Sequence, residues 1–305
     1  MVERPKGVMP PRQRPPRRTP RSVIYRRRFA AIAVLIAGFA IAWFAVASIK
    51  GGGGTKAQPP TTPLTPKPFR VVFPEGFTRV QMAERVGVVA KIAQRERGHE
   101  PKLAAMTYLA ATSRPRFIPG FGRHPLEGFL FPATYDFTRK TTSAQLASRQ
   151  LQAFQRSWPN VNLAYARSKN LTPYDVLIIA SMIEEETAAP EERQLVSAVI
   201  YNRLHDRMQL GIDATLRYGL HIPPTESIHQ SQLETPGPYN TSAIAGHFGL
   251  PPTPIGNPGL ASMQAAAHPA HVDYLYYVRK PDKKHHFFTA SLAAFNAYKA
   301  AHGYG

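Results

Sequence analysis

Three consecutive glutamates, Glu184, Glu185 and Glu186, follow a long apolar run and are the residues best suited to chemistry. Successive side chains on a helix lie ~100° apart, so Glu184 and Glu186 would point about 200° away from one another. The partial negative charge at the end of a helix and the neighbouring carboxylates both favour a protonated glutamate there. One of the three could therefore hold a proton near neutral pH and serve as a general acid. The alternative is a solvated acidic end of a helix without any chemical role.

The helix that must carry these carboxylates is predicted over residues 172–187. Thr172 can act as its N-cap, Pro173 suits the first turn, and Asp175 stands where a capping-box acid would stand. Residues 176–180 are apolar on every side, which indicates a buried helix.

Further elements are expected on both sides of this helix. Helices are predicted over 143–158, from Pro190 onward, over 262–267 and over 291–301, with a strand over 274–278. Residues 211–258 are rich in Gly, Pro, Thr and Asn. A loop-dominated stretch of this length in a compact domain is usually functional.

The loop-dominated stretch contains polar and aromatic side chains suited to sugar hydroxyl groups and sugar rings. They fall into three groups, which are Asp213, Thr215 and Tyr218; Glu234, Tyr239, Asn240 and Thr241; and Leu250–Pro252 with Asn257–Gly259. Each group taken alone could also be an ordinary turn or loop.

The chain has 305 residues and a formal net charge of +19, and much of that charge is concentrated in residues 1–28. This Arg- and Pro-rich segment is expected to be cytoplasmic and disordered. Residues 29–49 are free of charge and, at ~31 Å as a helix, long enough to span a bilayer. Arginines before this run place the N-terminus in the cytoplasm and the rest of the chain outside. A cleavable signal peptide is the alternative, because Ala45-Val46-Ala47 resembles a cleavage site.

Beyond this anchor, residues 50–68 form a Gly-, Pro- and Thr-rich linker. Residues 69–73 read as a strand, 74–76 as a turn and 80–86 as a helix, which together look like a small LysM-like module. A polar helical segment over 88–113 completes the region 69–120, and residues 121–305 are expected to form the main domain. The expected fold class is α+β. Because the basic charge is explained by membrane topology, nucleic-acid binding is only a weak alternative. The absence of cysteine excludes disulfides, thiolate metal sites and a cysteine nucleophile.

The order and spacing of several motifs resemble those of the MltG-type (YceG-like) endolytic murein transglycosylases. The resemblance covers the chain from about Phe69 to its end. The matching segments are Leu126–Pro132, Ala180–Thr187, Tyr201–Leu204, Met208–Gly219, Leu233–Pro236, Tyr239–Thr241, Gly249–Pro252, Asn257–Gly259, Ala265–Pro269, Tyr274–Tyr276 and His286–Phe287.

The resemblance implies a membrane-anchored lytic transglycosylase in which Glu186, the second glutamate of a Glu-x-Glu-Thr motif, is the catalytic acid. It implies cleavage of the MurNAc–GlcNAc β-1,4 bond within nascent glycan strands, giving 1,6-anhydro-MurNAc ends and terminating elongation. Peptidoglycan synthases are the partners that this role suggests. No metal or other cofactor is expected. The residues expected to bind the glycan are Glu184, Asp213, Thr215, Tyr218, Glu234, Tyr239, Asn240 and Glu127. The chain departs from the family pattern at Glu185, where a basic residue is common, at Ala214 in place of proline, and at Gly211 in place of glutamine.

Two other hypotheses remain open at this point. A peptidoglycan-binding anchor without catalysis could use the same sugar groove. A metal site is suggested by the His-x-x-His spacing of His268 and His271 and by the nearby pair His285 and His286, although Pro269 interrupts a helical face. A nucleophilic triad has no supporting motif.

Overall fold

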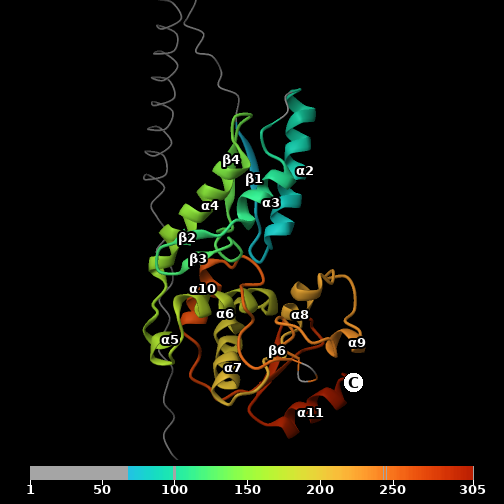
Figure 1. Ribbon diagram of the computed structural model, residues 1–305. Coiled ribbons are helices and arrows are strands. Elements are labelled where there is room, and N and C mark those ends of the chain that lie inside the picture. Colours follow the sequence, from blue (N-terminus) through green and yellow to red (C-terminus); the bar gives the residue numbers. More distant parts are fainter. Residues whose placement is uncertain (1–67, 99–100, 243, 245, 305) are drawn as a thin grey trace, which may run out of the picture. The chain divides into compact units, whose positions relative to one another are not determined.

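The computed structural model describes residues 68–98, 101–242, 244 and 246–304 (Figure 1). Residues 66–305 group into one compact unit. The predicted cytoplasmic segment, anchor helix and nearly all of the linker lie outside the described residues. None of the helices within the described ranges is both long and apolar enough to cross a membrane.

The described chain is built from helices and short antiparallel strands. The strands are β1 (Phe69–Val72), β2 (Arg116–Ile118), β3 (Gly122–His124), β4 (Thr134–Phe137), β5 (Tyr276–Arg279) and β6 (His286–Thr289). The helices are α2 (Arg79–Arg97), α3 (Ala105–Ser113), α4 (Ser143–Ser157), α5 (Ala164–Ser168), α6 (Pro173–Glu186), α7 (Arg193–His205), α8 (Asp213–Leu220), α9 (Gln230–Leu233), α10 (Leu260–Ala267) and α11 (Leu292–Ala301), with 3-10 turns η1 (Trp158–Asn160) and η2 (Pro190–Glu192). The described strands pair as β1–β4, β2–β3 and β5–β6. The fold is therefore a mixture of helices and strands, as the α+β prediction requires.

The first part of the unit is built on β1, α2, α3, β4 and α4. Strand β1 pairs antiparallel with β4, with Val71 opposite Tyr135. Helices α2 and α4 both begin with a capping box, in which Thr78 or Thr142 exchanges hydrogen bonds with the glutamine three residues later. Because β4 follows residue 120, this strand pairing crosses the boundary that the sequence suggested between a small module and the main domain.

Helix α6 lies at the centre of the second part, as its sequence predicted. Thr172 and Asp175 form the capping box, Pro173 occupies the first turn, and every residue from Val176 to Ile183 is buried. Helices α7 and α10 pack against α6. The Ser181 hydroxyl accepts a hydrogen bond from the backbone N–H of Ile255 at 3.0 Å, which fixes a later loop on the same helix.

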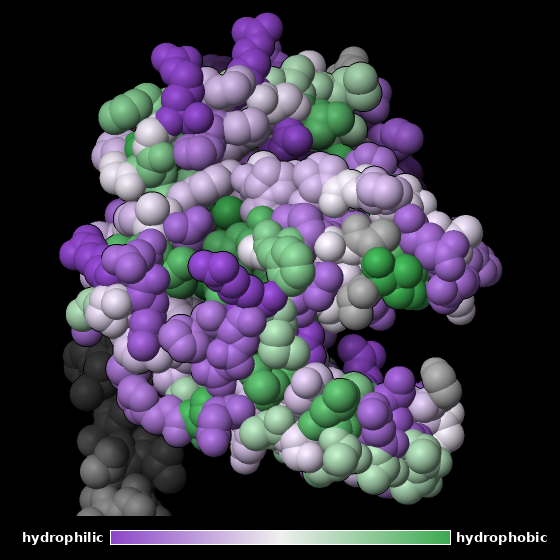
Figure 2. Space-filling model, turned by 60° about the horizontal axis from the view of Figure 1, so that its bottom comes forward, coloured by the Kyte–Doolittle hydropathy of each residue, from purple (hydrophilic) through white to green (hydrophobic). Residues whose placement is uncertain are grey.

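A notch opens on one side of the surface. In the space-filling view of Figure 2, hydrophilic and hydrophobic residues both border this notch. Helices α8 and α9 and the ribbon β5–β6 lie in the same region of the ribbon diagram (Figure 1).

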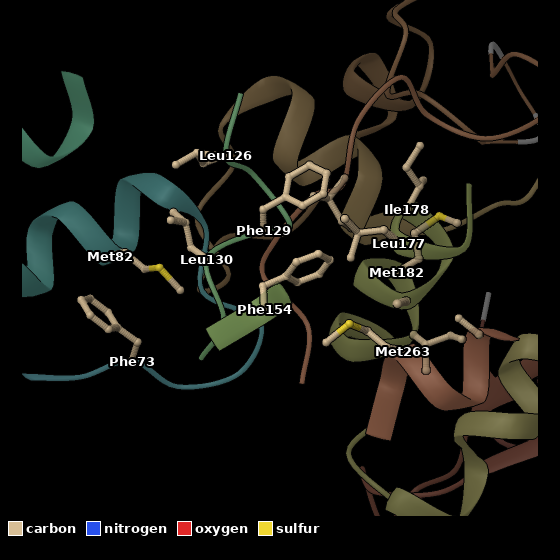
Figure 3. Packing of buried hydrophobic residues seen from close by; sticks show 14 of the residues in the cluster. Phe73, Met82, Leu126, Phe129, Leu130, Phe154, Leu177, Ile178, Met182 and Met263 are labelled. Atoms are coloured by element: carbon tan, nitrogen blue, oxygen red, sulfur yellow. The ribbon is translucent and has the colours of Figure 1, made fainter. Parts of the chain in front are cut away.

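A single hydrophobic cluster joins the two parts of the unit. Figure 3 shows Phe129 and Phe154 between the residues of α2 and those of α6, with Met263 of α10 next to α6. The rings of Phe129 and Phe154 meet edge to face at 5.1 Å. Because apolar burial is the largest favourable contribution to folding, this cluster fixes how α6 is held relative to α2.

The strand predicted over 69–73 is observed at Phe69–Val72. The helices predicted over 143–158, 172–187 and 291–301 are observed at Ser143–Ser157, Pro173–Glu186 and Leu292–Ala301. The helix expected over 80–86 is longer and runs from Arg79 to Arg97. The sequence did not predict α8, β6 or the ribbon β2–β3. Each of these helices and strands, taken singly, is at most eight residues long, so periodicity had too few residues to reveal it.

Candidate active site

The carboxylates at the end of α6 point in opposite directions, as their helical spacing predicted. Glu184 accepts a hydrogen bond from the backbone N–H of Gly259 at 2.9 Å and lies 3.9 Å from the Arg193 guanidinium. Glu186 instead accepts a hydrogen bond from the Tyr277 hydroxyl at 3.0 Å. Glu184 and Glu186 therefore have different neighbours, one set on each side of α6.

Glu186 combines partial exposure with a raised carboxyl pKa. Its residue is partly exposed, and the surrounding protein raises the pKa of its carboxyl. The nearby Asp213 charge raises this pKa further, whereas the Tyr277 hydroxyl, the Arg279 guanidinium and the Ala214 backbone N–H oppose the increase. A carboxyl with a raised pKa and access to solvent can hold a proton and give it away, which is what a general acid must do.

The ribbon β5–β6 positions Tyr277, and α7 holds the ribbon. Asn202 of α7 donates hydrogen bonds to the carbonyl groups of Val272 and Tyr274, each at 2.9 Å. Arg203, the next residue of α7, donates to the carbonyl of Leu275 at 2.6 Å. The segment that leads into β5 is therefore attached to α7 over four residues.

A second anchor fixes the partner strand β6. His286 lies at its start, where both its backbone N–H and its Nδ1 contact the Glu192 carboxylate, at 2.9 and 2.7 Å. Both side chains are buried. Tyr277, Asn202, Arg203 and Glu192 were not among the predicted site residues, and His286 was considered only as a metal ligand. Strand alternation indicates that Tyr276 and Tyr277 face opposite sides, but it does not indicate which side faces Glu186.

Glu185 lies between the Glu184 side and the Glu186 side of α6. Glu185 is exposed as a whole residue. Partial burial of its carboxyl group, together with the charges of Glu184 and Glu186, nevertheless raises the pKa of Glu185 to about 7. Its Oε1 would lie only 2.8 Å from a Cβ built on Gly76, in the turn after β1. The departure from the family pattern at this position therefore places a third titratable carboxyl beside the site.

Another carboxyl, Glu75, lies on the Glu184 side of α6. Burial and the charge of Glu184 raise the pKa of Glu75, and Arg193 opposes this. A Cβ added to Gly259 would overlap the Glu75 carboxylate, so the two segments are in close contact. Glu75 was not predicted, because it lies in a turn far from α6 in the sequence. The Glu184 side is thus a packed junction, and a role for Glu184 in binding substrate stays a prediction.

Helix α8 brings Asp213 to the Glu186 side. Asp213 is exposed on one side, and the protein around its carboxyl raises its pKa. It lines a pocket of about 260 Å³, together with Gly211, Ile212, Leu216, Leu233, Ser242 and Ile244. Asp213 and Ser242 supply the polar side chains of this pocket and its other side chains are apolar, so it could hold part of a ligand.

Thr215 faces the interior of the protein. Its buried hydroxyl lies 2.9 Å from that of Thr241 and donates to the carbonyl of Ile212 at 2.7 Å. Thr215 therefore joins α8 to the loop at Thr241 and holds Asp213 in place.

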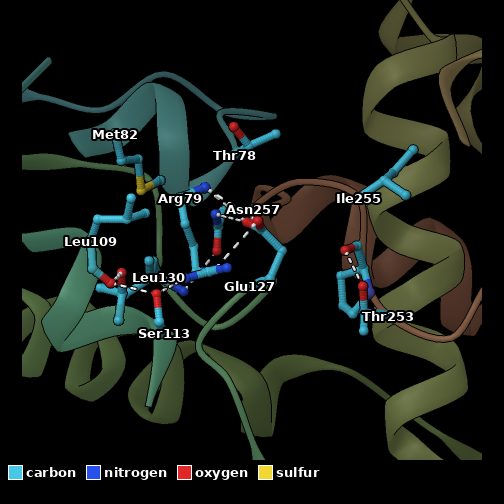
Figure 4. Close-up of polar contacts among 12 residues, drawn as sticks. Thr78, Arg79, Met82, Leu109, Ser113, Glu127, Leu130, Thr253, Ile255 and Asn257 are labelled. Atoms are coloured by element: carbon cyan, nitrogen blue, oxygen red, sulfur yellow. Dashed lines mark hydrogen bonds and ion pairs between the residues drawn. The ribbon is translucent and has the colours of Figure 1, made fainter. Parts of the chain in front are cut away.

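Glu127 is buried and forms a polar network with Arg79 and Asn257 (Figure 4). The Glu127 carboxylate accepts hydrogen bonds from the Arg79 backbone N–H at 3.0 Å, the Tyr218 hydroxyl at 3.1 Å and the Asn257 side chain at 2.9 Å. Burial raises the pKa of Glu127 to about 7, against the opposing effect of the Arg79 guanidinium. Both oxygens are thus occupied by protein donors, and this network joins α2, α8 and the loop before α10.

The remaining predicted binding residues, Glu234, Tyr239 and Asn240, lie in the segment that follows α9. The rings of Tyr218 and Tyr239 lie 5.1 Å apart, and the Tyr239 hydroxyl contacts Thr253 at 2.7 Å. Asn240 is buried and donates to the carbonyl groups of Leu233 and Thr235. Glu234 is exposed and contacts Gln230. Of the predicted residues, Asp213 is therefore the one gathered beside Glu186, and direct binding by the others stays a prediction.

The histidines do not assemble into a ligand cluster within the described residues. His285 contacts Asp282 and Glu191, and His286 contacts Glu192. The rings of His268 and His271 lie 6.4 Å apart, edge to face. No group of three or more His, Cys, Asp or Glu side chains in the described ranges could hold a metal ion.

Comparison with known proteins gives a consistent family. Residues 55–301 match the model of the YceG-like family. The chain is 35% identical over 179 residues to the endolytic murein transglycosylase of Bacillus subtilis (strain 168), covering 58% of this chain and 48% of that protein. It is 31% identical over 253 residues to the protein of the same name from Streptococcus pneumoniae (strain ATCC BAA-255 / R6), covering 75% of this chain and 42% of that one. The chain thus spans less than half the length of these curated relatives.

A solved structure supports the same fold. The crystal structure of a YceG-like protein from Listeria monocytogenes is 29% identical in sequence, has a TM-score of 0.61, and each chain is covered to 76%.

Proposed function

The chain belongs to the YceG-like family, and on this basis we propose that it is an endolytic peptidoglycan lytic transglycosylase. The observation that carries the proposal is the position of Glu186, a partly exposed carboxyl with a raised pKa at the end of a buried helix. The names of the Bacillus and Streptococcus relatives support the substrate class, which is murein.

One acid is sufficient for this reaction. Hydrolytic glycosidases usually use two carboxylates, one to protonate the leaving oxygen and one to activate water or attack carbon. In a lytic transglycosylase, the C6 hydroxyl of the N-acetylmuramyl residue attacks its own C1, so the substrate supplies the nucleophile at high effective concentration.

Glu186 performs both proton transfers in this scheme. Its carboxyl gives a proton to the glycosidic oxygen as the bond from that oxygen to C1 of the muramyl residue breaks. The resulting carboxylate then takes the proton of the C6 hydroxyl as O6 bonds to C1. The product is a 1,6-anhydro-muramyl end, no water is consumed, and Glu186 returns to its protonated form.

Digestion of purified peptidoglycan by the full chain tests the proposal. We expect new glycan ends that lack one water relative to reducing ends, because an intramolecular hydroxyl replaces water as the nucleophile. Mass spectrometry of the released fragments distinguishes the two products. Reducing ends would indicate hydrolysis instead, and binding without any new ends would favour a peptidoglycan-binding module.

The N-terminal region adds a location to this function. We propose that residues 29–49 anchor the enzyme in the membrane, that residues 1–28 are cytoplasmic, and that the β1–α2–α3–β4 part acts as a LysM-like module. An anchored domain would cut glycan close to its site of synthesis and could thereby terminate elongation beside peptidoglycan synthases.

The predicted topology can be tested with reporter fusions. We expect a reporter joined after Gly54 to be active only if it works outside the cytoplasm, because the arginines before Phe29 retain the N-terminus inside. A reporter joined before Phe29 is the matched control and should behave in the opposite way. Cytoplasmic activity of the fusion after Gly54 would refute the anchor orientation.

A further inference from the structure

The Tyr277 hydroxyl is the side-chain donor that contacts Glu186 directly. It lies 3.0 Å from Oε2 of Glu186. Burial, followed by the charge of Glu186, raises the pKa of Tyr277 well above its ordinary value. The hydroxyl therefore keeps its proton across the working pH range and remains a donor.

The protein restricts where this hydroxyl can move. The Tyr277 ring lies between neighbours on β6, edge to face with His286 at 5.4 Å and tilted against Phe288 at 5.7 Å. His286 is itself held by the buried Glu192, and the segment before β5 is held by Asn202 and Arg203. The Tyr277 ring is thus packed against side chains of an anchored ribbon, which restricts where its hydroxyl can point.

We propose that Tyr277 is a positioning residue that directs the transferable proton of Glu186 to Oε1 by donating a hydrogen bond to Oε2. This inference deepens the proposed function and rests on it. The physical reason is that a carbonyl oxygen accepts a hydrogen bond better than a protonated oxygen does. A fixed donor at Oε2 therefore favours the form of the acid in which Oε1 carries the proton.

The same contact serves the second half of the reaction. Once Glu186 has given up its proton, the hydroxyl donates to a charged oxygen, and hydrogen bonds to charged groups are the stronger kind. Tyr277 would thus stabilise the carboxylate until it takes the proton of the C6 hydroxyl. No atom is transferred to or from Tyr277.

Other charged groups face the same carboxyl and set the background for this effect. Asp213 of α8 disfavours the carboxylate, Arg279 of β5 favours it, and Glu185 on α6 is a further like charge. Arg203 of α7 acts on the Tyr277 hydroxyl. These groups remain in place when the Tyr277 hydroxyl alone is removed, so their contribution cancels in the comparison.

The first test is Tyr277→Phe, with Tyr276→Phe as its matched control. Both remove one phenolic oxygen, but the Tyr276 ring lies on the other face of β5, 5.6 Å from the Arg203 guanidinium. We expect Tyr277→Phe to lower kcat by about 10- to 100-fold with little change in KM, and Tyr276→Phe to do neither. We also expect the alkaline limb of the pH profile to move to higher pH, because the carboxylate has lost a donor.

A second measurement separates this inference from the proposed function and from simple loss of structure. The infrared carboxyl band that disappears in Glu186→Gln reports the protonation of Glu186 without any substrate. The pH at which half of this band is lost should be higher in Tyr277→Phe. It should be lower when position 277 carries 3-fluorotyrosine, because that residue is a stronger hydrogen-bond donor. Loss of structure would not produce shifts of opposite sign.

The possible outcomes are distinct. Opposite shifts in a protein that yields no anhydro ends would support the role of Tyr277 at this carboxyl and refute the proposed function. The inference about Tyr277 would be overturned if Tyr277→Phe kept the wild-type turnover and the wild-type titration midpoint of Glu186. Equal shifts of that midpoint in Tyr277→Phe and Tyr276→Phe would also overturn it.

Discussion

Glu186→Gln is expected to abolish the formation of 1,6-anhydro-muramyl ends while leaving the fold intact. An amide has nearly the shape of the carboxyl group but cannot donate the proton to the glycosidic oxygen. Loss of a general acid typically lowers the rate ~10²- to 10⁴-fold. The variant would be incubated with glycan strands, the anhydro ends counted by mass spectrometry, and the fold checked by circular dichroism.

The neighbouring glutamates provide matched controls for this result. Glu185→Gln removes a like charge from the surroundings of Glu186, so it should change the pH profile more than the maximal rate. Glu184 lies on the opposite side of the helix, where it contacts Gly259 and Arg193. Glu184→Gln should therefore leave the maximal rate largely unchanged. Normal turnover in Glu186→Gln together with an inactive Glu184→Gln would assign the acid to the other side of α6.

The position of Glu186 could be predicted because it depends on local structure. Capping by Thr172 and Asp175, the apolar run and the 3.6-residue period together determine where α6 begins and how its last carboxylates diverge. Each of these properties is contained within about fifteen consecutive residues. The structure agrees with them one by one.

The partners of Glu186 could not be predicted in the same way. Tyr277 lies 91 residues further along the chain, and its placement depends on Asn202, Arg203 and Glu192 holding the ribbon β5–β6. Such contacts between distant segments leave no periodic signal in a single sequence.

Residue type also gave an incomplete guide to the site. Thr215, Asn240 and Glu127 have side chains suited to sugars, but in the structure their polar atoms are occupied by protein partners. Buried polar groups are usually satisfied in this manner, because an unpaired one costs free energy. A hydrogen-bonding side chain in a loop is therefore as consistent with a scaffold as with a binding site, until its neighbours are known.

Asn257 illustrates this distinction and gives the second large prediction. The sequence placed it among the groups suited to sugar, but it is fully buried. Its Oδ1 accepts from the Leu130 backbone N–H at 2.9 Å, and its Nδ2 donates to the Phe77 carbonyl at 2.8 Å and to Glu127 at 2.9 Å (Figure 4). One amide thus satisfies three groups on two segments, the turn before α2 at Phe77 and the loop that contains Glu127 and Leu130.

Asn257→Leu is expected to lower the free energy of unfolding by about 3 kcal/mol or more. Leucine has a similar volume but no polar atoms, so the buried Leu130 backbone N–H is left unpaired, which costs about 1–3 kcal/mol. The Phe77 carbonyl and the Glu127 carboxylate each lose one hydrogen bond but keep their backbone partners. Urea denaturation of the variant and the wild type measures the difference. Asn160→Leu is the matched control, because Asn160 is exposed and donates only to the carbonyl of Ser157, and it should be nearly neutral.

Kinetics on the same variant separates a scaffold role from a binding role. If Asn257 only supports the fold, the fraction of Asn257→Leu that remains folded should cleave glycan with a KM close to that of the wild type. A variant that keeps its stability but shows a raised KM would mean that the amide contacts the sugar and that the buried arrangement opens on binding. A scaffold role therefore predicts lower stability with an unchanged KM, whereas a binding role predicts unchanged stability with a raised KM. Both quantities can be measured on one protein preparation.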